Sequence, residues 1–241
     1  MHRLVVWLLL VVLSLPAQAN AAISCDAAFP VTSGTTASET VTITVPAETN
    51  RRSVIAVLDR SESATITGGV PTDDGGGTWV ERGAQYDSTS TTARTWLFER
   101  SGGGTGSTII TVAFSGIINS VLVAGTCWSD TASLDFVSAA TPSEHTPATV
   151  DWVGPSRTFT NTGIIFGYTG QNGNATLTPV GSEVVKNTST LRSHIVTLAG
   201  SSGASNQAVT LNATAVGSYG AVLYQEAASA STNFFPRRRE Q

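Results

Sequence analysis

Short apolar segments separated by polar, glycine-rich turns recur along most of the chain. Residues 40–45 alternate, with Val41, Ile43 and Val45 on one side and threonines on the other, which predicts a strand with one wet face. Residues 53–58 are apolar at almost every position, as expected for a strand covered on both faces. The pattern therefore predicts β-strands rather than amphipathic helices, whose apolar residues recur every three or four positions.

The remaining segments extend this pattern to roughly eleven strands in all. The further predicted strands cover residues 79–80, 95–99, 108–114, 119–128, 163–168, 176–185, 191–198, 208–211 and 219–224. A series of short strands with turns between them favours an antiparallel sandwich or barrel over a parallel α/β sheet. The sequence thus predicts an all-β fold.

The composition agrees with this fold class and excludes one class of binding partner. Only 12% of the residues are charged, whereas 62 are serine or threonine and 23 are glycine. Such a composition suits twisted sheets and tight turns better than helices. The formal net charge of −4 argues against nucleic acid as a partner, because binding phosphates requires clustered positive charge.

The first 19 residues have the features of a secretion signal. Arg3 precedes an apolar run over residues 4–15, and Ala17 and Ala19 supply the small residues of a cleavage site. The run is shorter than the roughly twenty residues that cross a bilayer. We expect residues 1–19 to be a cleaved signal peptide, the alternative being a retained anchor. The mature chain is expected to be secreted or at the cell surface, without a stable membrane span.

The mature chain is predicted to form a single β-sandwich domain over residues 39–228. Residues 20–38 are interpreted as a lead-in, and residues 229–241 as a flexible basic tail, with a docking peptide as the alternative for the tail. A proline-bearing stretch at 142–155 is an alternative domain boundary, but Trp152 within it is unusual for a solvated linker. No residue-level repeat relates the two halves.

Two cysteines lie in the mature chain, at Cys25 and Cys127. An even number of cysteines in an exported protein favours a disulfide. The alternatives are a lipid anchor on Cys25 and two unpaired thiols. A zinc site is not expected, because these two residues cannot complete a tetrahedral set of ligands without neighbouring histidines.

Several anchors occur in an order that resembles a known class of domain. They are a threonine/valine strand ending in proline (Val41 to Pro46), a basic residue before an apolar strand (Arg52 to Leu58), a turn and tryptophan (Gly75-Gly76-Gly77-Thr78-Trp79), Arg94 to Phe98, Ile109 to Val112, and Gly220 to Leu223. This order resembles jelly-roll, concanavalin-like β-sandwich modules of secreted bacterial surface proteins and phage structural proteins. The resemblance implies a jelly-roll-like antiparallel sandwich and a role in surface attachment, polymer binding or assembly.

No catalytic motif stands out. Sandwich glycoside hydrolases carry acids that alternate on one strand, but Asp73 and Asp74 are adjacent and lie in a glycine-rich turn. His194 alternates with apolar residues and is interpreted as structural. Neither a nucleophile elbow nor a phosphate-binding loop is present. We therefore predict a non-enzyme without cofactor or metal, although the two acids could contribute to a Ca²⁺ site.

The tryptophans are the candidates for ligand contact, because flat aromatic rings stack on sugars. Trp96 and Trp128 lie among apolar neighbours and are assigned to the core. Trp79 and Trp152 are each close to acids and are assigned to the surface. The predicted ligand-binding residues are Trp79, Asp73, Asp74 and Trp152.

These features together predict an exported, non-catalytic cell-surface module that binds carbohydrate or an envelope polymer. One alternative is a structural subunit of a surface filament or virion-like assembly, with sister subunits as partners that exchange edge strands. The other is a glycoside hydrolase-like enzyme whose site is built from distant loops.

Overall fold

The computed structural model describes residues 23–26, 29–60, 64–87, 94–172, 176–179, 184–186, 192–206 and 208–228. The predicted signal peptide and basic tail lie outside these residues. The described elements, β1 to β17, are all strands, and every pairing between them is antiparallel, which confirms the all-β class. There are more strands than the eleven predicted.

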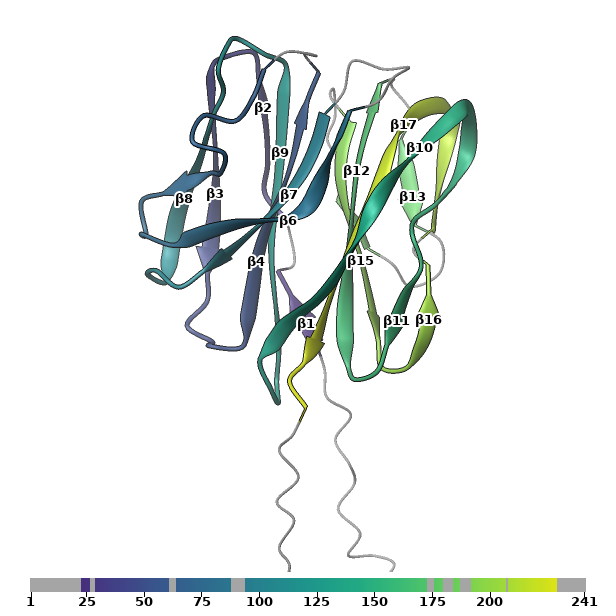
Figure 1. Cartoon of the computed structure of the whole chain (residues 1–241). Coiled ribbons are helices and arrows are strands. Elements are labelled where there is room, and N and C mark those ends of the chain that lie inside the picture. Colours follow the sequence, from purple (N-terminus) through teal and green to yellow (C-terminus); the bar gives the residue numbers. More distant parts are fainter. Residues whose placement is uncertain are drawn as a thin grey trace, which may run out of the picture.

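A central sheet organises the molecule (Figure 1). Its strands follow the order β1-β9-β4-β7-β6, and β2 also pairs with β9. Their bounds are β1 (Ile23–Cys25), β2 (Val31–Gly34), β4 (Arg51–Asp59), β6 (Thr78–Asp87), β7 (Arg94–Ser101) and β9 (Ser120–Ser129).

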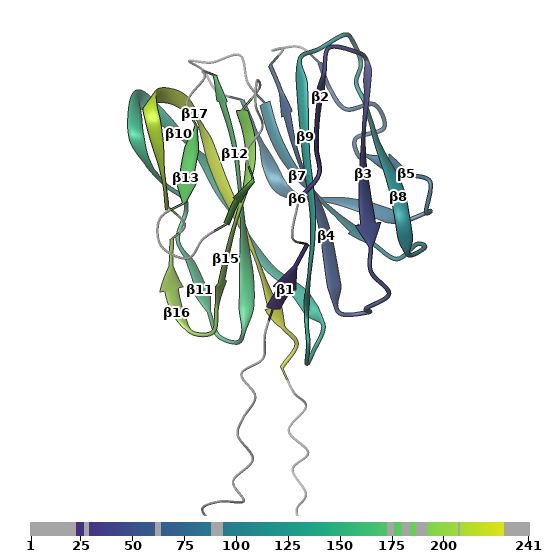
Figure 2. The same ribbon diagram turned by 180° about the vertical axis from the view of Figure 1, so that it is seen from behind.

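Other sheets lie on both sides of the central sheet (Figures 1 and 2). The flanking sheet contains β3 (Ser38–Val45), β8 (Gly106–Ala113) and β5 (Thr72–Asp73). The facing sheet contains β10 (Leu134–Val153), β17 (Ala208–Glu226), β12 (Gly163–Asn172), β15 (Arg192–Gly200), β14 (Val184–Lys186) and β13 (Leu177–Pro179). A small sheet of β11 (Arg157–Phe159) and β16 (Gly203–Ser205) packs on the outer side of the facing sheet.

Side chains alternate between the two faces of the central sheet, so they contribute to two separate hydrophobic cores. Ile55 and Val57 of β4 pack toward the flanking sheet, whereas Val54 and Leu58 of the same strand pack toward the facing sheet. The prediction that residues 53–58 form a strand buried on both faces is confirmed. β3 has the alternating burial expected for residues 40–45, because only one of its faces meets a core.

The two halves of the chain repeat one pairing scheme. In the first half the pairs are nested, with β2 on β9, β3 on β8 and β4 on β7. In the second half β10 pairs with β17, β11 with β16 and β12 with β15. The repeat is therefore one of topology, which explains why the residues themselves show no recognisable duplication.

Two regions in which no strand was predicted contain strands. The lead-in contains β1 and β2, which cover the outer edge of β9 and satisfy its backbone groups. The stretch 142–155 is not a linker, because β10 continues through it as far as Val153 beside β17. Irregularities in the register at several points let this long strand bend while it contains prolines.

The predicted disulfide is present. Cys25 on β1 lies directly opposite Cys127 on β9, and the two sulfur atoms are bonded across a sequence separation of 102 residues. Cys127 is fully buried. The bond attaches the first described strand to the central sheet.

Reduction of this disulfide is expected to lower the melting temperature by several degrees. A loop of this length constrains the unfolded chain by about 4–5 kcal/mol in the chain-entropy account. Calorimetry with and without reductant measures the effect, and a Cys25→Ala/Cys127→Ala variant should be insensitive to reductant. Equal melting of the oxidised and reduced wild type would contradict the expectation.

Candidate functional site

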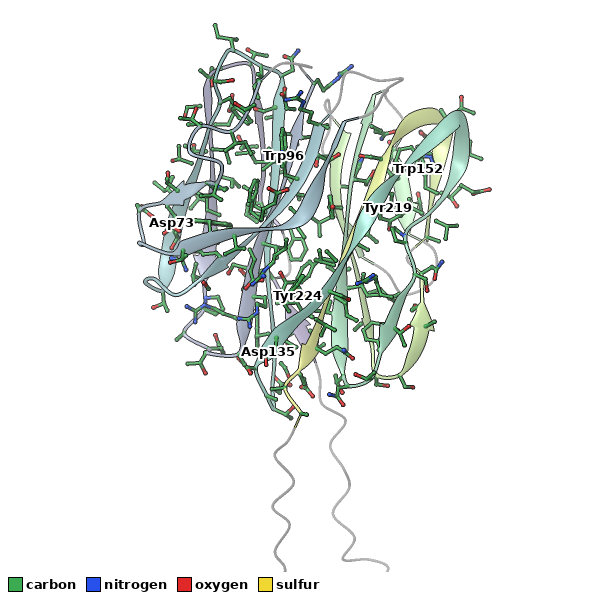
Figure 3. The ribbon with its side chains drawn as sticks, in the orientation of Figure 1. Asp73, Trp96, Asp135, Trp152, Tyr219 and Tyr224 are labelled. Atoms are coloured by element: carbon green, nitrogen blue, oxygen red, sulfur yellow. A yellow bond between two sulfur atoms is a disulfide. The ribbon has the colours of Figure 1, made fainter. Side chains whose placement is uncertain are left out.

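Both tryptophans assigned to the surface are buried, so this assignment was wrong. Trp79 is 6% exposed and belongs to the core between the central and flanking sheets. Trp152 is 0% exposed and packs near Tyr219 in the second half (Figure 3). Asp151, which suggested exposure of Trp152, points to the opposite face of the same strand, whereas Asp73, which suggested exposure of Trp79, is itself hydrogen-bonded to the Trp79 ring. Neither ring has a free face on which a sugar could stack.

Asp73 is part of a buried ion pair with Arg100. Arg100 Nε donates to Asp73 Oδ2 at 3.0 Å, and Nη2 donates to Oδ1 at 3.2 Å. The same carboxylate accepts hydrogen bonds from the Gly77 backbone N–H at 3.0 Å and from Trp79 Nε1 at 2.7 Å. The two charged side chains are almost fully buried, so Asp73 positions Arg100 rather than facing solvent.

The glycine-rich turns enclose the Arg100 guanidinium. Its Nη1 donates to the carbonyl of Gly102 at 2.9 Å. A Cβ on Gly77 would lie 2.4 Å from Arg100 Nε, and one on Gly103 would lie 2.6 Å from the backbone nitrogen of Gly77. The turns are rich in glycine because two backbone segments pack closely around one guanidinium, which leaves no room for further side chains.

The pKa of Asp73 lies below its ordinary value. Burial by itself would raise this pKa, but the hydrogen bonds from Arg100, Gly77 and Trp79 and the positive charge of Arg100 outweigh it. Asp74 has a different role, since its Oδ1 accepts a hydrogen bond from the Ile109 backbone N–H at 2.8 Å on the exposed side of the turn. The adjacent acids therefore do not converge on one ion.

The remaining predicted residues are distributed over the fold. Trp96 is 4% exposed, so its assignment to the core is confirmed. Trp128 was assigned to the core as well, but it is only half-buried at the end of β9. His194 is fully buried, and its Nε2 lies 3.4 Å from Gln171 Nε2. Among the described residues, no group of three or more His, Cys, Asp and Glu side chains could hold a metal ion.

A second buried carboxylate joins the central and facing sheets. Glu99 accepts hydrogen bonds from Arg82 Nε at 2.7 Å and from the Tyr224 hydroxyl at 2.8 Å. Arg52 Nε lies 3.7 Å from the other Glu99 oxygen, while Arg52 Nη2 donates to Asp135 at 3.2 Å. Figure 3 places Tyr224 and Asp135 together at the lower side of the interface. Burial first, and then the negative charge of Glu99, raise the pKa of Tyr224 well above its ordinary value.

An open pocket lies at the end of the central sheet next to these two ion-pair clusters. It has a volume of about 240 Å³ and is lined by Thr49, Arg51, Arg52, Arg100, Ser101 and Gly102. β4 begins at this margin and the antiparallel β7 ends there, so their terminal residues meet. We call these six residues the arginine pocket.

The arginines of this pocket differ in their partners. Arg100 is paired with Asp73, and Arg52 with Glu99 and Asp135. Arg51 donates from Nη1 to the backbone carbonyl of Glu48, which is an uncharged acceptor. Partial burial and the positive charge of Arg100 lower the pKa of Arg51, against an opposite effect of the Glu48 carboxylate. A guanidinium remains charged under all ordinary conditions, so Arg51 makes the pocket attractive to anions.

Sequence reasoning missed this pocket. Arg51 and Arg52 are adjacent in the chain, but Arg100 and Ser101 are about fifty residues away and reach them only through strand pairing. The available signal was the pair of arginines that opens an otherwise apolar strand. In the part of the chain that the structure describes, three of eight arginines line one pocket of a protein with negative net charge.

Comparisons with known proteins add no further assignment. No family model matches the chain, and no curated protein or solved structure is significantly similar to it. The described residues include no helix that is long and apolar enough to span a membrane.

Replacing Trp79 or Trp96 by alanine is expected to destabilise the fold by about 3–5 kcal/mol in each case, because both rings fill the same core. Denaturant unfolding of the two variants measures this. Ile117→Ala is the control, since Ile117 is 80% exposed and its truncation should change stability little. A tolerated Trp79→Ala variant would contradict the buried position of Trp79.

Asp73→Asn is expected to cost about 3–5 kcal/mol at neutral pH, because the substitution leaves the Arg100 charge buried without its counter-ion. The lowered folded-state pKa of Asp73 contributes stability above the unfolded value of 3.8 that is lost as the pH falls through the folded value. The difference in unfolding free energy between wild type and variant should therefore be constant from pH 5 to 7, because these pH values lie about one unit or more above both pKa values of Asp73. It should shrink below about pH 4 in denaturant melts. A difference that does not depend on pH would contradict the charged pairing.

Proposed function

We propose that this protein is an exported, non-catalytic module that binds carbohydrate or an envelope polymer through the arginine pocket. One observation carries the proposal, namely that Arg51 and Arg52 line a single open pocket with two hydroxyl residues, Thr49 and Ser101, while the buried Arg100 beside them adds positive charge. Guanidinium groups and hydroxyls are suited to the oxygen atoms of sugars and of acidic groups. The volume of about 240 Å³ is slightly below the range of sites for drug-sized ligands, which suits one unit of a polymer.

The chemistry of the lining supports binding rather than catalysis. The described lining residues include neither a carboxylate nor a histidine. Glycoside hydrolysis requires two carboxyl groups about 5–10 Å apart on either side of the bond that breaks. Glu99, the buried acid beside this region, already accepts hydrogen bonds from Arg82 and Tyr224. Its Oε2 accepts both of these bonds, its Oε1 is paired with Arg52, and the bond from Tyr224 joins the central sheet to the facing sheet.

The order of the strands supports a jelly-roll-like architecture for each half. A jelly roll is a long antiparallel ribbon that is wrapped so that its nested strand pairs are divided between two sheets. In the first half, the nested pairs β2–β9 and β4–β7 lie in the central sheet and β3–β8 in the flanking sheet. We infer that the molecule consists of two such ribbons that share the core between the central and facing sheets.

Export is supported by the apolar segment of residues 4–15 with its cleavage site and by the disulfide between Cys25 and Cys127. Disulfides persist in oxidising compartments and are uncommon in the reducing cytosol. A polymer-binding role at the cell surface is consistent with both features. The alternative role as a subunit of a surface assembly is separated from it by the following experiment.

The proposal is tested by retention of the purified mature protein on immobilised cell-wall and capsular polysaccharides. Wild type should be retained on at least one polymer, and Arg51→Gln should reduce the retained fraction at least about tenfold, since charge-assisted hydrogen bonds are strong. Arg60→Gln is the matched control, because Arg60 follows the opposite end of β4. Equal retention of both variants would contradict the proposed site. Filaments or large oligomers without retention on any polymer would favour the role as a subunit.

A further inference from the structure

A row of residues runs from β9 across β4 to the turn after β7, at the margin of the central sheet that contains the arginine pocket. The pairing of β4 with β9 places Arg51 directly opposite Trp128. On the other side of β4, the register that pairs Ser53 with Arg100 brings Gly102, just after β7, beside Arg51. The row therefore contains an aromatic ring, a cation and a residue without a side chain.

The members of this row lie on one face of the sheet. Residues directly opposite one another in an antiparallel pair have Cβ atoms about 4.5–5.5 Å apart on the same side. Arg51 shares this side with Arg100, since Arg51 and Ser53 are two residues apart on β4 and Ser53 is opposite Arg100. Trp128 is half-buried, unlike the fully covered apolar residues that precede it in β9. Trp128 is thus partly exposed on the side of the sheet to which Arg51 points.

Space for a ligand is present at the Gly102 end of the row. A Cβ placed on Gly102 would have no atom within 4 Å, and its φ of +65° favours glycine. Gly102 also lines the arginine pocket together with Ser101 and Arg51. The open volume of the pocket therefore lies beside Arg51, whose described hydrogen-bond acceptor is an uncharged carbonyl.

We propose that this row is a subsite for an acidic sugar unit, whose oxoanion group pairs with Arg51 and whose ring contacts Trp128. This inference rests on the proposed function and specifies its ligand class. The planar fork of a guanidinium matches the two oxygens of a carboxylate and equally those of a sulfate or phosphate ester. An aromatic face suits the apolar face of a sugar ring. Together the two groups select a ring that carries an acid over a neutral ring.

Arg52 connects this subsite to the interface between the two halves. Arg52 is one of the residues that line the pocket, and its Nη2 donates to Asp135, whose side chain is 57% exposed. An oxoanion in the pocket competes with the Asp135 carboxylate for Arg52. Removing the negative charge of Asp135 should therefore strengthen binding of an acidic ligand, which is the opposite of the usual effect of a substitution near a binding site.

A glycan fits these observations better than a nucleic acid. The chain has a formal net charge of −4, and the described positive groups of this region form one small pocket rather than a long track. Binding to a nucleic acid backbone depends on many phosphate contacts made at the same time. A single acidic unit held by one arginine and one aromatic ring requires only this row.

The test compares matched polymers by isothermal titration calorimetry with the mature wild-type protein. Polygalacturonate is compared with its fully methyl-esterified form, and dextran sulfate with dextran, so that each pair differs only in the acid. A polymer joined by phosphodiesters is the third source of oxoanion, and single-stranded DNA is the polyanion control. Binding to one of the acidic polymers at least about tenfold more tightly than to its neutral counterpart and to DNA is the expected result.

Two variants within the row and one at Asp135, outside it, make the test specific. Arg51→Gln should abolish the preference for the acidic polymer, and Trp128→Leu should weaken binding about three- to tenfold. Asp135→Asn should tighten it about two- to fivefold, because an exposed ion pair is weak but competes directly. The ligand should also protect wild-type tryptophan fluorescence from acrylamide, since Trp79, Trp96 and Trp152 are already buried. This measurement does not depend on whether Trp128→Leu folds.

The outcomes separate the inference from the proposed function. Equal affinity for acidic and neutral polymers, with loss of binding in Arg51→Gln, would overturn the acidic subsite and leave the binding module intact. Binding to no polymer at all would overturn both. Equal binding to DNA would overturn the selection of a sugar, and an unchanged or weaker affinity of Asp135→Asn would overturn the competition for Arg52.

Discussion

Burial of the central sheet on both faces is the constraint on which the rest of the structure depends. Strands β4 and β9 are covered by the flanking sheet on one side and by the facing sheet on the other, so their interior positions have no contact with water. Both strands must therefore be almost continuously apolar or small. Polar groups gather at the strand ends, and the ends of β4, β7 and β9 meet at one margin because these strands are antiparallel.

Strand β7 carries two buried charged residues next to each other, and their arrangement follows from the same constraint. Glu99 and Arg100 are adjacent, so they point to opposite faces of the central sheet, and both are buried. Glu99 is neutralised from the facing side by Arg52 and Arg82, while Arg100 is neutralised from the flanking side by Asp73. Neither charge can be left alone in such a position, because an unpaired buried charge is strongly destabilising. One strand thus connects three layers through two ion-pair clusters.

The arginine pocket forms where this double coverage ends. Arg52 and Arg100 take part in the ion-pair clusters and also line the pocket, so the interactions that hold the layers together position its cationic wall. Arg51, in contrast, takes part in neither of the two ion-pair clusters described above. The half-buried position of Trp128 has the same origin, since it lies one residue from the end of β9. Because the fold already orders these groups, binding of the proposed ligand at this margin would have a lower entropic cost.

Much of the fold was predictable from local pattern. The alternation of residues 40–45, the apolar segment 53–58 and the burial of Trp96 are confirmed, since side chains on a pleated strand report directly on which faces are covered. The disulfide was predictable from the number of cysteines and the features of an exported chain. The strands in residues 20–38 and 142–155 were missed, because their backbone pairing with β9 and β17 outweighs a composition typical of loops.

The sequence by itself determined the class of fold, the double coverage of its central strand and the pairing of its cysteines, all of which depend on local periodicity or on composition. Only the tertiary structure decided which polar residues are buried and which line the arginine pocket. Asp73 and Trp79 looked exposed beside a glycine-rich turn, but the long-range pairing of Asp73 with Arg100 draws both of them inward. Arg51 and Trp128 are 77 positions apart and become neighbours only through the register of β4 and β9. The partner of a side chain across a sheet is set by strand register, and no local pattern records it.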